Sequence, residues 1–105
     1  MTGPEATLQE AAERLETLAG RTTGGDWRLA GLLATRPEVV AVGPDGGTEH
    51  VAEARAGSGA WIAVLSPAIA PPLTALLRAV AAGGPVDDVA ADLARVLLER
   101  LDRRP

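Results

Sequence analysis

The spacing of apolar residues in the first part of the chain predicts an amphipathic helix. Apolar positions recur at three- and four-residue steps, and charged residues occupy the other face. The apolar face consists of Leu8, Ala11, Ala12, Leu15, Leu18 and Ala19. Thr2-Gly3-Pro4-Glu5 has the T-x-x-E spacing of a capping box, and Gly20 suits the position that follows a helix.

Three short segments with strand character follow the turn-rich residues 21–26. They are Trp27–Leu33, Glu38–Val42 and Thr48–Arg55, and the adjacent valines of the second favour an extended backbone. Between the second and the third, Pro44-Asp45-Gly46-Gly47 supplies the proline and glycines of a tight turn. Together the segments predict a three-stranded antiparallel meander.

Three further helices are expected after the strands. Ser58 has the side chain to cap a helix from Gly59 or Ala60 to Leu65, the next helix runs from Ala70 to Gly83, and the last opens at Pro85. The apolar stripe of the last helix is expected to be Val86, Val89, Leu93, Val96, Leu97 and Leu101. The sequence thus predicts an α+β fold, a single domain over residues 1–105 in which three helices pack on one face of the sheet.

The longest stretch without a charged side chain runs from Ala56 to Leu77. A stretch of this length is either a membrane span or the central packing element of a small domain. Pro67, Pro71 and Pro72 interrupt it, and most of its other residues are small and gain little from lipid. The sequence therefore predicts packing within the domain and no membrane partner.

The aromatic content is low enough to predict which side chains anchor the core. The chain has two Trp, one Met, and neither Phe nor Tyr, so small aliphatic residues must fill most of the interior. Trp27 and Trp61 are accordingly expected to be core anchors. Cutting either to alanine in a well-packed core would cost about 3–5 kcal/mol.

Charge and cysteine content exclude several classes of function. The formal net charge is −4, which argues against a nucleic-acid binder, and all ten basic residues are Arg, a bias typical of a GC-rich genome. The absence of Cys excludes disulfides and thiolate metal sites and is compatible with a reducing cytoplasm. The acidic first residues have no apolar segment, so we expect no signal peptide and a cytoplasmic protein.

Two stretches carry a resemblance to a known family. The segment Thr23-Gly24-Gly25-Asp26-Trp27-Arg28-Leu29 is similar to a "TPGPWRV" opening. A later "VAE … A-x-I-A … P-x-L-L" pattern is matched by Val51-Ala52-Glu53, Ala60-Trp61-Ile62-Ala63, Pro67 and Pro71 to Leu77. Over residues 20–80 the chain thus resembles small actinobacterial and phage-encoded Ead-like proteins. Asp26 stands where the pattern has a second proline. The resemblance implies no catalytic residues, and it implies that Trp27 on the sheet packs against the helix bearing Trp61.

Catalytic and metal-binding constellations are weak in this sequence. Ser58, His50 and Asp45 could form a Ser–His–Asp set, but no nucleophile elbow surrounds the serine. Glu49, His50 and Glu53 could supply metal ligands, but a strand sends Glu49 and His50 to opposite faces. We therefore predict no catalytic residues, no metal site, no cofactor and no enzymatic activity.

Two polar features suggest other kinds of binding. Gly57-Ser58-Gly59 follows a strand and opens a helix, a layout that presents free N–H groups to an anion or small ligand, with a capped tight connection as the plainer reading. The acidic residues of the first helix could meet a basic partner or simply be solvated. These are Glu5, Glu10, Glu13 and Glu16.

The last helix has more apolar residues than one packed face requires. Val96, Leu97 and Leu98 are consecutive, and Leu98 falls off the expected stripe. With Leu101 they are candidates for a protein–protein interface, including a homodimer. The leading hypothesis is a small cytoplasmic, non-enzymatic protein-interaction or self-associating module whose protein partner is unknown. The alternative is a ligand- or anion-binding domain that uses Gly57-Ser58-Gly59.

Overall fold

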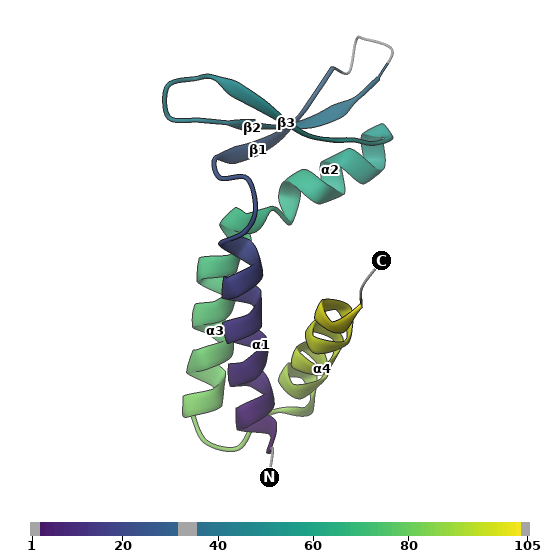
Figure 1. Cartoon of the computed structure of the whole chain (residues 1–105). Helices are drawn as coiled ribbons and strands as arrows, with labels where there is room; N and C mark the ends of the chain where they lie inside the picture. The colour runs from purple at the N-terminus through teal and green to yellow at the C-terminus, as the bar shows by residue number, and fades with distance from the viewer. Residues whose placement is uncertain (1–2, 32–35, 104–105) are drawn as a thin grey trace. The chain divides into compact units, whose positions relative to one another are not determined.

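The structure, a computed structural model, describes residues 3–31 and 36–103. Its elements occur in the order predicted, an N-terminal helix, three strands and then helices, so the α+β class is confirmed (Figure 1). In chain order they are α1 (Pro4–Ala19), β1 (Asp26–Ala30), β2 (Glu38–Val42), β3 (Thr48–Glu53), α2 (Ala56–Val64), the 3₁₀ helix η1 (Pro67–Ile69), α3 (Ala70–Ala82) and α4 (Asp88–Asp102).

These elements form two compact units. The helical unit comprises Met1–Arg21 and Ala70–Pro105, with α1, α3 and α4, and the sheet unit comprises Thr22–Ile69, with the strands, α2 and η1. Of the three helices that follow the sheet, α2 packs on it, whereas α3 and α4 pack against α1. The prediction that residues 1–105 form a single domain stays a prediction.

The core of the helical unit is built largely from alanine. Small side chains let α1, α3 and α4 approach closely, and the two leucines in this core fill the space that remains. The buried residues are Leu8, Ala11 and Ala12 of α1, Leu77 and Ala81 of α3, and Ala94 of α4. The predicted capping box does not form the start of α1, because the N-cap is Gly3, which has no side chain to accept a hydrogen bond. Thr2 lies outside the described residues.

An ion pair joins α1 to α3 in the same unit. Arg78 donates to both carboxylate oxygens of Glu16, from Nη1 to Oε2 at 2.8 Å and from Nη2 to Oε1 at 2.5 Å. Two parallel charge-assisted hydrogen bonds of this kind are stronger than neutral ones and also define the relative orientation of the two side chains. The hydrogen bond from Arg78 lowers the pKa of Glu16, and the bond to Glu16 raises the pKa of Arg78.

The sheet is an antiparallel meander with β2 at its centre, as predicted. Trp27 of β1 lies opposite Ala41 of β2, and Val40 lies opposite His50 of β3. In the turn between β2 and β3, Gly46 has φ 83°, which favours glycine, and Asp45 accepts a hydrogen bond from the Gly47 amide. β3 ends at Glu53, two residues earlier than expected, and β1 ends at Ala30.

Helix α2 lies against β1 and β2 and begins earlier than the sequence suggested. Its N-cap is Arg55, with no side-chain capping bond, so the prediction that Ser58 caps this helix is wrong. Gly59 is buried against the sheet, and a Cβ at this position would lie 2.6 Å from Cδ1 of Leu29. The glycine therefore lets the helix approach the strands closely. The strand that carries Trp27 packs against the helix that carries Trp61. A contact of Trp27 itself with that helix, which the family resemblance implies, stays a prediction.

Helix α4 is well capped but is turned differently from the prediction. Asp87 is its N-cap and accepts a hydrogen bond from the Val89 amide at 2.9 Å. The residues of α4 that pack against the core of the helical unit are Ala90, Ala94, Leu97 and Leu98. The expected stripe is wrong for Val89 and Leu93, which are exposed, because small alanines rather than the larger aliphatic residues take the packed positions.

The uncharged stretch retains one property of a membrane segment. The segment Ala56–Ala82, which extends this stretch past Arg78, contains an 18-residue window with a mean hydropathy of 1.7, and by length and composition it could cross a bilayer; 22% of that window is buried. Along this stretch α2 ends at Val64 and η1 precedes α3, so the backbone is not one continuous α-helix. The prediction of no membrane partner stays a prediction.

Candidate functional site

The residues predicted to bind a ligand form the first turn of α2 rather than a loop. Gly57 and Ser58 are exposed, whereas Gly59 is buried, and its amide donates to the Arg55 carbonyl at 2.7 Å. The amide of Gly59 is therefore used within the helix. Any anion would have to meet the amides that come before it, at the exposed end of α2.

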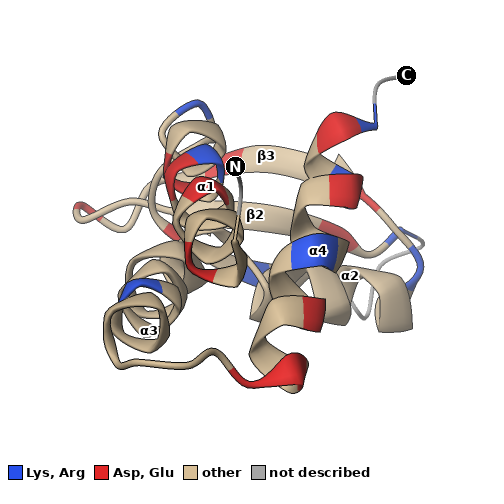
Figure 2. Ribbon diagram, turned by 90° about the horizontal axis from the view of Figure 1, so that it is seen from below, with Lys and Arg blue, Asp and Glu red and all other residues tan. Residues whose placement is uncertain are grey.

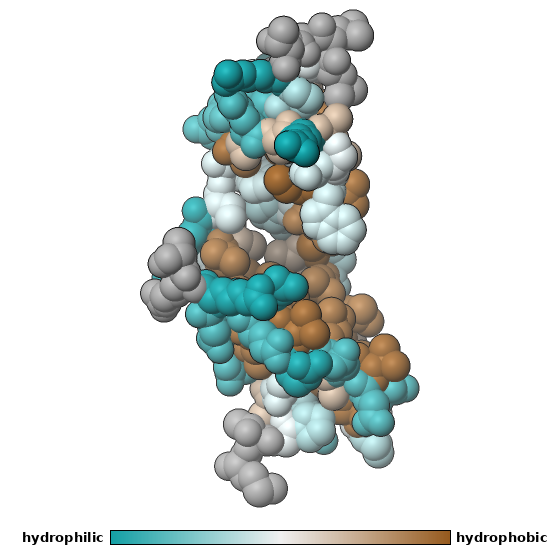
Figure 3. Space-filling model, turned by 90° about the vertical axis from the view of Figure 1, so that its right-hand side faces the viewer, coloured by the Kyte–Doolittle hydropathy of each residue, from teal (hydrophilic) through white to brown (hydrophobic). Residues whose placement is uncertain are grey.

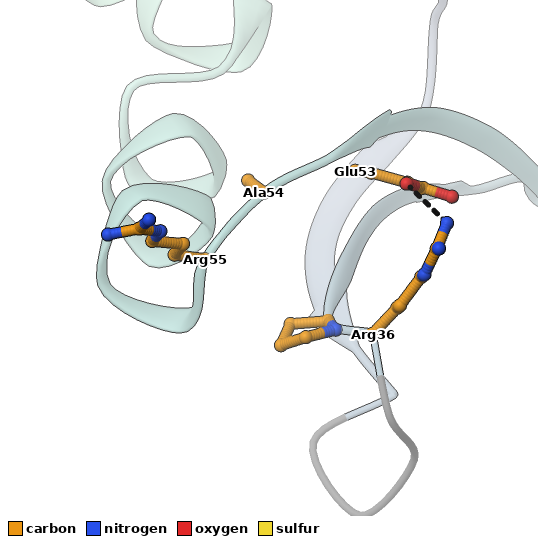
Figure 4. A pocket seen from close by; sticks show the side chains of 5 residues that line it. Arg36, Glu53, Ala54 and Arg55 are labelled. Carbon is orange, nitrogen blue, oxygen red and sulfur yellow. Dashed lines mark hydrogen bonds and ion pairs between the residues drawn. The ribbon is translucent and has the colours of Figure 1, made fainter.

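A shallow hollow lies beside the start of α2 within the sheet unit (Figure 4). Its volume is about 330 Å³, and it is lined by Arg36, Pro37, Glu53, Ala54 and Arg55. Arg36 is paired with Glu53, Nη1 to Oε2, at 3.3 Å, and Figure 4 shows the Arg55 side chain directed away from that pair. Two arginines and one carboxylate leave the hollow weakly positive. None of the described residues that line it is a buried polar group.

His50 and Asp45, which were considered for catalysis and metal binding, make contacts of other kinds. His50 Nδ1 lies 2.5 Å from Glu38 Oε2 across β2 and β3, and Asp45 holds the turn before β3. Ser58 lies in the first turn of α2. Within residues 3–31 and 36–103, no group of three or more His, Asp or Glu side chains is arranged to hold a metal ion.

The two tryptophans have different environments. Trp27 is half-buried, and its Nε1 donates to the Thr23 carbonyl at 2.9 Å, which satisfies the polar end of the ring. Trp61 is 68% exposed, so the prediction that it anchors the core is wrong. The physical reason is Gly59: with glycine toward the sheet, the residues three and four positions later turn inward, and Trp61 turns outward.

The outward side of α2 is an uncharged surface that sequence reasoning missed. We call it the α2 surface; it consists of Gly57, Ala60, Trp61, Val64 and Leu65, all exposed. Val64 is 70% exposed, and a large aromatic residue beside exposed aliphatic ones is a typical feature of protein–protein interfaces. The signal in the sequence was Gly59, a glycine within the predicted helix, which indicates a side of the helix that can approach the sheet closely.

A second apolar surface runs along α4. Val89 is 78% exposed, Leu93 is 40% exposed, and Val96 is half-buried one turn further on. Of the interface residues predicted from the sequence, Leu97 and Leu98 pack against the core of the helical unit, and Leu101 lines a shallow hollow with Leu18 of α1. Figure 3 shows apolar residues, in brown, lying among hydrophilic ones, in teal, over the helical unit.

Comparisons with known proteins add no family to this description. No protein-family model matches the sequence, and neither the curated proteins nor the solved structures give a match. The resemblance to Ead-like proteins therefore stays a prediction.

Proposed function

We propose that this chain is a cytoplasmic, non-enzymatic interaction module that binds another protein through the α2 surface. The observation that carries the proposal is the exposure of Trp61 and Val64 on a helix without a charged side chain. Exposing this much apolar surface to water is unfavourable, and covering it with a partner removes that cost. Trp is also one of the residue types enriched among the strong contributors to protein interfaces.

The geometry of α2 suits this role. Gly59 packs closely on the sheet and holds the inner side of the helix in place. The side chains on the outer side therefore project from a well-positioned backbone. A preformed surface loses little conformational entropy when a partner docks on it. An amphipathic segment or groove of matching apolar character is the kind of partner that fits.

The proposal is tested by affinity capture from an actinobacterial lysate with paired variants. Wild-type protein should retain a stoichiometric partner that Val64→Asp loses, because the aspartate places a charge in the centre of the apolar surface. Glu49→Gln, an exposed change on β3, is the control and should capture as wild type does. Equal capture by Val64→Asp and wild type, or no capture by either, would refute the proposal.

Anion binding is a second candidate, because the two arginines of the hollow lie beside the start of α2. Arg55 is the N-cap of the helix, and the positive end of the helix dipole adds to its charge. A thermal-shift titration with phosphate should then raise the melting temperature, and Arg55→Gln should reduce the shift. No shift up to millimolar phosphate would count against this candidate.

A further inference from the structure

We infer that α4 pairs antiparallel with α4 of a second copy of the chain, through Val89, Leu93 and Val96. This inference goes beyond the proposed function, because it concerns a surface on α4 that is separate from the α2 surface. It starts from the spacing of three apolar residues on one side of α4. They recur at steps of four and three, which is the spacing of a seam between two helices. Arg100, four residues further, continues the same line.

This seam differs from the face of α4 that is already packed. Ala90, Ala94, Leu97 and Leu98 are turned toward the core of the helical unit, whereas Val89 is 78% exposed. The helical unit therefore covers only part of the apolar surface of α4. The core that it helps to form is small and rich in alanine, so burying a second face would add stabilisation that the unit lacks.

The distribution of charge along α4 selects the second copy as the occupant and the antiparallel direction. The first turns carry Asp88 and Asp92. The end of the helix carries Arg100 and Arg103 together with Glu99 and Asp102, so Figure 2 shows both red and blue toward that end of α4. Glu99 is paired with Arg95 and Asp102 with Arg14 of α1, which leaves the arginines as the charges there without a partner carboxylate among the described residues. Within the described part of the chain, Asp88 and Arg100 make no ion pair. Antiparallel pairing about the Leu93–Val96 turn brings Asp88, at the start of each helix, toward Arg100, at the end of the other. Parallel pairing would instead place Arg100 against Arg100.

The middle of the helix fits the same arrangement. Arg95 binds Asp92 at 2.5 Å and Glu99 at 2.7 Å, so the carboxylates nearest the centre are already paired within one copy. The unpaired charges that remain lie toward the two ends. A two-fold axis repeats each contact between these ends, so every charge change acts twice.

The test is sedimentation equilibrium of the full chain and of charge-reversed variants. Wild type should form a dimer, and Leu93→Ser, an exposed change, should leave far-UV circular dichroism unchanged but weaken the dimer. Asp88→Arg and Arg100→Glu should each weaken it by about tenfold or more, because each places like charges together twice. The double variant Asp88→Arg/Arg100→Glu should restore it, since the complementary ends are exchanged. Glu49→Arg, on the sheet unit, is the matched control and should dimerise as wild type does.

Three results would overturn the inference. They are a monomer at all concentrations, a dimer that Leu93→Ser leaves intact, and a double variant no tighter than the single ones. None of these bears on the α2 surface, because capture by that surface is compared between wild type and Val64→Asp. A monomer that still captures a partner through the α2 surface would end the inference and leave the proposed function standing.

Discussion

Replacing Trp61 with alanine should cost far less stability than the loss of a buried tryptophan. About a third of Trp61 is covered, since it is 68% exposed. A fully buried tryptophan removes up to about 250 Å² from water, so a third of that is ~80 Å². At about 25 cal/mol per Å² this surface contributes ~2 kcal/mol.

The expected loss is smaller than this upper figure. Alanine keeps the contacts of Cβ, and the unfolded chain already covers part of the surface, so we expect ~1 kcal/mol for Trp61→Ala. A tryptophan anchored in the core would lose about 3–5 kcal/mol. The two cases differ by more than the uncertainty of a denaturation experiment.

Urea denaturation followed by tryptophan fluorescence measures this difference. In Trp61→Ala the single remaining tryptophan is Trp27, which belongs to the sheet unit and reports its unfolding even if the helical unit unfolds separately. Trp61→Phe is the reference, because it also leaves Trp27 alone and keeps an aromatic ring at position 61. A loss of about 3 kcal/mol or more relative to Trp61→Phe would show that residue 61 is buried and would refute the reasoning.

Other substitutions probe the packing of each unit. Gly57→Ala should stabilise α2 by about 0.5–1 kcal/mol, because Gly57 is exposed in a helix and a Cβ there meets no atom within 4 Å. Gly59→Val should destabilise by about 1–3 kcal/mol through overpacking against the sheet, and equal effects of the two glycine changes in urea denaturation would contradict this account. Leu77→Ala should cost about 2–5 kcal/mol in the helical unit, because Leu77 is 2% exposed; a change under 1 kcal/mol by circular dichroism would be inconsistent with its burial. The hydrogen bond from Arg78 lowers the pKa of Glu16, so this pair stabilises the fold above the ordinary carboxyl pKa, and the contribution disappears as the pH falls through the lowered pKa. Glu16→Gln should therefore flatten the acid side of the melting temperature plotted against pH, and an unchanged profile would exclude this contribution.

The order and type of the elements could be read from the sequence because their signals are local. Adjacent valines in β2, the proline–glycine turn before β3 and the aspartate at the start of α4 each act within a few residues. The last helix was expected to open at Pro85, and Asp87, two residues later, is the residue that caps it. These local features do not depend on how the rest of the chain packs.

The orientation of the helices could not be read in the same way, because it depends on how closely each helix approaches its neighbour. Large side chains were expected to face inward. In α2 a glycine faces the sheet instead, and Trp61 turns outward. In α4 an alanine is at the centre of the packed face, and Val89 turns outward. In a chain of small residues, close backbone contact takes the place of large apolar side chains. Both proposed surfaces were missed or misplaced for this reason.

The most direct test of the interaction proposal is fluorine NMR of protein in which both tryptophans are replaced by fluorotryptophan. The resonances are assigned with Trp27→Phe and Trp61→Phe, and solvent access is measured as the shift of each resonance between H₂O and D₂O. In dilute buffer the Trp61 resonance should show a large solvent shift, because the ring is exposed. In actinobacterial extract that shift should fall as a partner covers the α2 surface, while the shift of Trp27 stays as it was. A Trp61 resonance that remains equally open to solvent in buffer and in extract would contradict the claim that this surface binds a protein.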